Sequence, residues 1–202
     1  MAWPASNSRA IIGSLFAREV VPFYLSLLAL ALATLAIDAA LHLADLVWVG
    51  KWLGIPGLAL ICGSFGYSLR KRKLISRGRP VTLLRLHERM AWAGSLLILV
   101  HAGIHFNAWL GWMAIWAMLL NVASGLTGKF LLRRARLRLT AKSDRLHAEG
   151  LKGAALEERL HWDSLTYAAV KQWKVLHVPV TLAFAILAAA HVISALIFWG
   201  GA

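Results

Sequence analysis

Five long apolar runs alternate with short polar or basic segments along the chain. The hydrocarbon core of a bilayer is about 30 Å thick, so about 20 helical residues cross it. Because backbone polar groups in lipid need internal partners, such runs are predicted to be helices. The predicted spans are Val20–Val49, Leu53–Leu69, Val81–His105, Ala108–Leu132 and Trp173–Trp199. The second span, which contains Pro56, is the shortest.

The composition agrees with this pattern. Of the 202 residues 59% are hydrophobic and only 15% are charged, whereas a soluble domain is about half apolar and a quarter charged. The net charge of +13 resides in segments between apolar runs, which argues against a nucleic-acid partner. We therefore expect an all-α integral membrane protein, one domain over residues 1–202, in contact with membrane lipid. The first run is interpreted as a retained span rather than a secretory signal.

Basic residues predict the orientation in the membrane. Arg9 and Arg18 precede the first span, "RKRKLISRGRP" joins the second to the third, and "KFLLRRARLRL" opens the connection after the fourth. With alternating helices these segments share one side, which the positive-inside rule makes cytoplasmic. Only Lys51 lies on the other side. The N-terminus is expected inside and the C-terminus outside.

The connection over residues 129–172 is the one sizeable polar segment. Its leucines recur at helical spacing with charges between them. We expect one or two amphipathic helices lying against the inner face of the bundle. They are either solvated loop helices or a docking surface for a soluble partner.

Two pairs of histidines lie within apolar runs. His87 and His101 are fourteen residues apart, and so are His177 and His191. Fourteen residues at 100° each return to within about 40° of the same helix face and rise about 21 Å. The predicted third and fifth spans run in parallel, so two bis-imidazole sites are expected to stack across the bilayer. Such ligation suits low-spin haem b, which transfers electrons.

Two observations show that the fourteen-residue spacing alone is weak evidence for haem ligands. His147 and His161 are also fourteen residues apart, but they lie in the polar connection and are assigned to coincidence. Intramembrane histidines can also serve in hydrogen bonds between helices.

The segments "LHERMAWAGSLLILVH", "GWMAIWAMLLNVASGL" and "WKVLHVPVTLAFAILAAAH" resemble the ferric reductase-like transmembrane domain of ferric reductases, NADPH oxidases and small bacterial relatives. The resemblance covers about residues 81–199. It implies two b haems, the inner bound by His87 and His177 and the outer by His101 and His191. It also implies a bacterial inner (plasma) membrane as the location.

The chain departs from this family in its five spans, its long fourth connection and the lack of flavin and nicotinamide domains. Electrons would therefore enter from a redox partner subunit (a flavin, iron–sulfur or cytochrome c protein) or from quinol. The cytochrome b of quinol–cytochrome c oxidoreductases is the alternative template. A haem-free membrane protein that handles protons or metal ions is a further alternative.

Five further residues surround the predicted ligands. Gly94 lies midway between His87 and His101 and either admits a macrocycle or packs helices together. Phe184 holds the equivalent position in the last span, either between the haems or as an ordinary apolar residue. Arg85, Arg89 and Lys174 either bind haem propionates or extend to the membrane interface.

A second candidate site lies at the outer end. His105 follows His101 by one turn but has no counterpart in the last span. Asp38, His42 and Asp45 recur at helical spacing on one face of the first span. Together these four residues are a candidate quinone or proton site, and the alternative is that they are hydrated interfacial residues.

Overall fold

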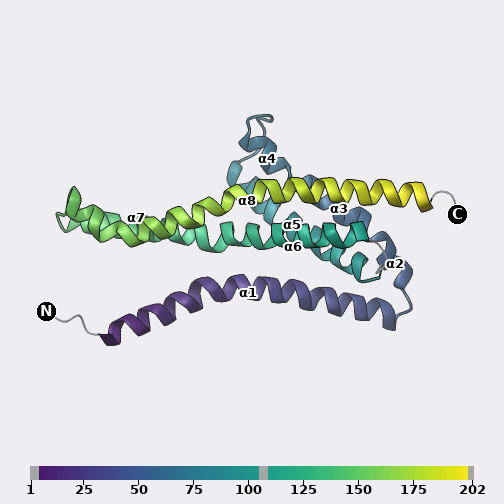
Figure 1. Ribbon diagram of the computed structural model, residues 1–202, viewed down its shortest axis with the longest axis horizontal. Helices are drawn as coiled ribbons and strands as arrows, with labels where there is room; N and C mark the ends of the chain where they lie inside the picture. Colours follow the sequence, from purple (N-terminus) through teal and green to yellow (C-terminus); the bar gives the residue numbers. More distant parts are fainter. Residues whose placement is uncertain (1–4, 105–108, 200–202) are drawn as a thin grey trace. The chain divides into compact units, whose positions relative to one another are not determined.

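The protein is a succession of helices without a strand in the part of the chain that the structure describes (Figure 1). The computed structural model describes residues 5–104 and 109–199. The elements are α1 (Ala5–Leu43), α2 (Val47–Trp52), α3 (Gly54–Ser64), α4 (Gly66–Lys71), α5 (Pro80–Ile104), α6 (Trp109–Leu126), the π-helix η1 (Thr127–Leu132), α7 (Arg133–Ala148) and α8 (Ala154–Trp199). The expected all-α class is confirmed for these residues.

Four stretches of the described chain are long and apolar enough to cross a membrane. They are Val21–Leu43, Val47–Lys71, Trp109–Ala148 and Val175–Phe198. Five spans were predicted, and the one that is not among these four is the third, which corresponds to α5. This helix has 25 residues, but Arg85, Glu88 and Arg89 lie in its first half and lower its hydropathy.

The first predicted boundary is wrong, because α1 ends at Leu43 rather than continuing to Val49. Asp45 has a left-handed φ of 56°. The N–H of Asp45 bonds to the carbonyl of His42 (3.2 Å), and that of Leu46 to Leu41 (2.8 Å). This is the Schellman arrangement, which terminates a helix. Residues 47–49 therefore begin the second apolar stretch.

Contacts divide the chain into two compact units. One combines the residues up to Leu27 with Ala123–Val178, and the other combines Leu28–Val122 with the chain from Pro179 onward. Pro179, inside α8, has no N–H to bond to the preceding turn. The second unit contains the buried cluster of Ile61, Met118 and Phe184.

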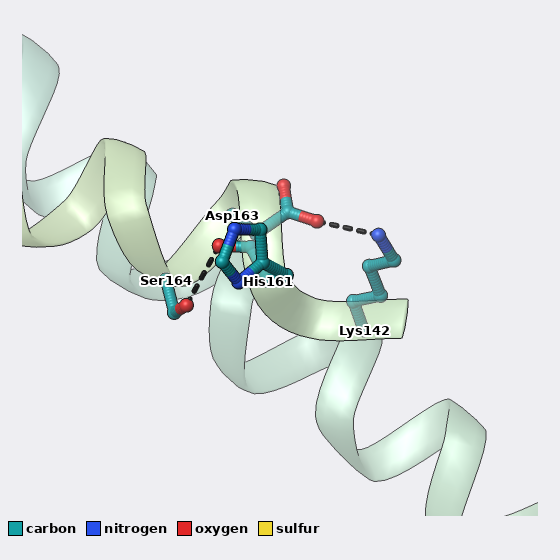
Figure 2. Close-up of polar contacts among 4 residues, drawn as sticks. All are labelled: Lys142, His161, Asp163 and Ser164. Atoms are coloured by element: carbon teal, nitrogen blue, oxygen red, sulfur yellow. Dashed lines mark hydrogen bonds and ion pairs between the residues drawn. The ribbon is translucent and has the colours of Figure 1, made fainter. Parts of the chain in front are cut away.

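The connection after the fourth apolar run differs from the expected surface helices. Instead, η1 and α7 continue α6 without interruption, and α8 begins at Ala154 and runs on into the last apolar stretch. A turn at Gly150 (φ 84°) reverses the chain into a helical hairpin. Lys142 on α7 and Asp163 on α8 form an ion pair across it (2.5 Å; Figure 2). The π-turn η1 lies within this continuous helical segment, which is where single π-turns are mostly found.

Candidate functional site

His87 is held by the end of the neighbouring helix. Its Nδ1 lies 3.0 Å from the backbone carbonyl oxygen of Ser64, the last residue of α3. A carbonyl only accepts, so Nδ1 carries the proton and donates it. In the neutral imidazole, Nε2 is then the nitrogen with the lone pair. The ring of Tyr67 lies 5.9 Å away, centre to centre.

His101 makes the same kind of contact fourteen residues further along α5. Its Nδ1 donates to the carbonyl oxygen of Gly50 over a longer 3.4 Å. Its ring lies against the backbone of α3 at Gly54, where a Cβ would stand 3.0–3.1 Å from three ring atoms. His101 therefore presents the same tautomer as His87.

The two contacts belong to one antiparallel register. Gly50, Gly57 and Ser64 follow one another at intervals of seven, as do His87, Gly94 and His101. The middle pair is in backbone contact, since a Cβ on Gly94 would stand 2.8 Å from the carbonyl oxygen of Gly57. This helix packing accounts for Gly94 without a cofactor.

The accepting carbonyls lie where the second apolar stretch is interrupted. Gly50 is in the last turn of α2, which Leu53 separates from α3, and Ser64 ends α3 before Phe65. Carbonyls in the last turn of a helix lack a full set of partners within it. The interval of seven in Gly50, Gly57 and Ser64 matches the interval of seven on α5, and this shared spacing is the only hint of the two contacts that the sequence contains.

His177, in the first unit, is held by a side chain. The hydroxyl of Ser124, in the last turn of α6, makes a short hydrogen bond with its Nδ1. Ser124 is buried, and a Cβ on the next residue, Gly125, would stand 4.0 Å from the ring. Sequence reasoning missed Ser124, because a lone serine in an apolar run carries no recognisable pattern.

The structure places the members of the predicted outer ligand pair in one unit, since both His101 and His191 belong to the second unit. Their shared ligation of a haem stays a prediction. His87 belongs to the second unit and His177 to the first. The pairing of His87 with His177 stays a prediction.

The remaining residues around the predicted ligands have varied environments. Phe184 is 3% exposed in the cluster with Ile61 and Met118. Arg85 and Arg89 are both exposed. The side chain of Lys174 lies outside the described part of the chain.

The candidate outer proton site is only partly assembled. Asp38 Oδ1 is buried beside Gly103 of α5 without a hydrogen-bond partner among the described residues, although His42 Nδ1 lies 3.7 Å from it. His42 Nδ1 donates to the backbone carbonyl of Asp38 (2.9 Å). Asp45 does not share their helix face, because it lies in the turn after α1. His105 lies outside the described residues.

His147 and His161 lie exposed on the α7–α8 hairpin. The carbonyl of His161 accepts a hydrogen bond from Ser164 (2.8 Å; Figure 2). Within the described ranges, no group of three or more histidine, cysteine, aspartate or glutamate side chains is placed to hold a metal ion. Bis-imidazole ligation requires only two.

Comparisons with known proteins complete the description of the site. No family model, no curated protein and no solved structure matches this chain.

Proposed function

We propose that this protein is a membrane-spanning cytochrome with two b haems that conducts electrons from one face of a membrane to the other. The observation that carries the proposal is the matched setting of His87 and His101. Each donates Nδ1–H to a backbone carbonyl, and the two carbonyls are spaced like the histidines themselves. An imidazole that ligates haem iron through Nε2 is oriented by a hydrogen bond of this kind.

The proposal includes five spans, with α5 as the third. Its N-terminal charges do not exclude it, because α5 lies alongside the apolar stretch Val47–Lys71 from Ser64 to Gly50. A helix that pairs with a membrane span over that length crosses the same layer. The basic connections then lie on the cytoplasmic side of a bacterial inner membrane.

Each haem takes two imidazoles, His87 with His177 inside and His101 with His191 outside. The haem supplies one-electron transfer, and the protein sets its potential through the ligands, their hydrogen bonds and burial. We assign the haem propionates to Arg85 and Arg89, which are exposed on α5 two residues before and two residues after His87, because guanidinium groups bind carboxylates. Lys174 has the same proposed role near His177.

We place the redox donor on a partner subunit. A subunit with flavin, an iron–sulfur cluster or cytochrome c fits the ferric reductase-like resemblance. Its docking surface is the cytoplasmic α7–α8 hairpin.

A quinol-reactive cytochrome b is the second candidate function. It is favoured by the buried Oδ1 of Asp38, which lies beside Gly103, two residues beyond His101. A carboxylate oxygen without a donor suits a ligand that offers a hydroxyl group and releases protons on oxidation.

The test is a dithionite-reduced minus oxidised spectrum of the purified protein, with haem per chain measured chemically. We expect two haems per wild-type chain and one in His101→Ala and in His191→Ala. The matched control is the double variant His147→Ala/His161→Ala, whose histidines have the same spacing but lie on the exposed hairpin, and it keeps two. A wild-type protein without a b-type α-band contradicts the proposal and favours a haem-free role.

A further inference from the structure

Ser124 distinguishes one predicted haem ligand from the others. His87 and His101 donate to backbone carbonyls, whereas the partner of His177 Nδ1 is a side-chain hydroxyl. A carbonyl is present whatever residue occupies the position. A hydroxyl depends on the residue, so this contact can be removed by a single substitution.

The hydroxyl of Ser124 is shielded from solvent. Because Ser124 is only 5% exposed, bulk water does not compete with His177 for a hydrogen bond to this hydroxyl. The neighbouring hydroxyl of Thr127 donates to the carbonyl of Ala123 (2.9 Å) and is thereby engaged within its own helix. Gly125 leaves room for the ring beside Ser124.

The direction of the hydrogen bond decides which nitrogen of His177 can bind a metal. A serine hydroxyl both donates and accepts. If it donates to Nδ1, the neutral ring carries its proton on Nε2 and is not a ligand through that atom. If it accepts from Nδ1–H, Nε2 has the lone pair. An acceptor on Nδ1–H also increases the electron density that the ring gives to a bound metal.

We propose that the Ser124 hydroxyl accepts a hydrogen bond from Nδ1–H of His177, and that Ser124 is thereby a positioning residue that orients this ring and sets the reduction potential of the haem that His177 binds separately from that of the outer haem. This inference rests on the proposed function. Removing the acceptor makes the ring a weaker electron donor, which favours the ferrous state. The inner potential is therefore expected to rise when the hydroxyl is lost.

The experiment is a redox titration of wild-type protein, Ser124→Ala and Thr127→Val, followed at the α-band. Thr127 is the matched control: it is buried in the same unit as Ser124, and its hydroxyl bonds to the carbonyl of Ala123 instead of to a histidine. We expect Ser124→Ala to raise one of two midpoint potentials, or to lose one haem per chain, and Thr127→Val to match wild type. Unchanged potentials and haem content in Ser124→Ala overturn the inference.

Ser124→Thr and Ser124→Val keep the test decisive if the alanine variant unfolds, because they have nearly the same shape and differ in the hydroxyl. The threonine variant is expected to retain the wild-type potentials and the valine variant to show the shift. Equal potentials in these two variants overturn the inference while leaving two haems, and so the proposed function, intact. A wild-type protein without haem overturns both.

Discussion

At the scale of single residues, the histidines are oriented by groups that the histidine pattern does not reveal. The imidazole of His101 lies against α3 because residue 54 is glycine, and its Nδ1 reaches a carbonyl at Gly50. His87 and His177 are each held by a serine, one through its backbone and the other through its hydroxyl. The tautomers of His87 and His101 are therefore decided by carbonyls on another helix, whereas Ser124 orients His177 through a hydroxyl.

Gly54→Ala is predicted to disturb the outer site. The new Cβ would stand 3.0–3.1 Å from the ring of His101, so the ring must move away from its position. Such overpacking costs about 1–3 kcal/mol. We expect reduced haem content with a normal inner haem, measured by haem per chain and by the α-band. Gly66→Ala is the control, because nothing lies within 4 Å of its Cβ, and equal losses in both variants would contradict the prediction.

At the scale of elements, α3 and α5 form the best-defined helix pair of the second unit. Small residues at intervals of seven let the backbones touch at Gly57 and Gly94. In lipid, such close contact is a main source of helix association, because burial of apolar surface gives no advantage there. The same register brings both histidines of α5 to accepting carbonyls.

Gly94→Ala is predicted to destabilise this pair by about 1–3 kcal/mol. Its Cβ would lie 2.8 Å from the carbonyl oxygen of Gly57, and a backbone atom cannot rotate away. Gly63→Ala is the matched control, because its Cβ meets only the end of the flexible Met90 side chain. Both variants gain the same helix propensity, about 1 kcal/mol. Thermal unfolding in detergent, followed by circular dichroism, should show a lower midpoint for Gly94→Ala than for Gly63→Ala. The reverse order would refute the assigned register.

At the scale of the whole molecule, polar and apolar parts share continuous helices. α8 begins in the charged hairpin and ends in an apolar stretch, whereas the α6–η1–α7 segment begins in an apolar stretch and ends in the charged hairpin. The exposed Lys142–Asp163 pair across the hairpin contributes at most about 1 kcal/mol. The ion pair is thus a minor contribution to the stability of the hairpin.

The proposed orientation predicts which turns face the cytoplasm. In a Cys62→Ala background, the chain has no other cysteine. Ala44→Cys is then expected to react with a membrane-impermeant maleimide on intact cells. Ser76→Cys and Ala155→Cys are expected to react only after lysis, because both lie beside the basic segments. Labelling of Ser76→Cys and Ala155→Cys on intact cells would contradict the proposed orientation and indicate the opposite one.

The sequence alone determined the helical class, the approximate apolar stretches and the candidate histidines, because a period of 3.6 residues and long apolar runs are local properties of a chain. It misplaced the end of α1, since a left-handed aspartate at residue 45 leaves no hydrophobic signal. It also treated the polar connection as separate surface helices, because charge does not reveal whether a helix is continuous with its neighbour. Only the tertiary structure decided what each histidine contacts. Those contacts with Gly50, Ser64 and Ser124 join residues far apart in the chain, and they depend on how closely two helix backbones approach.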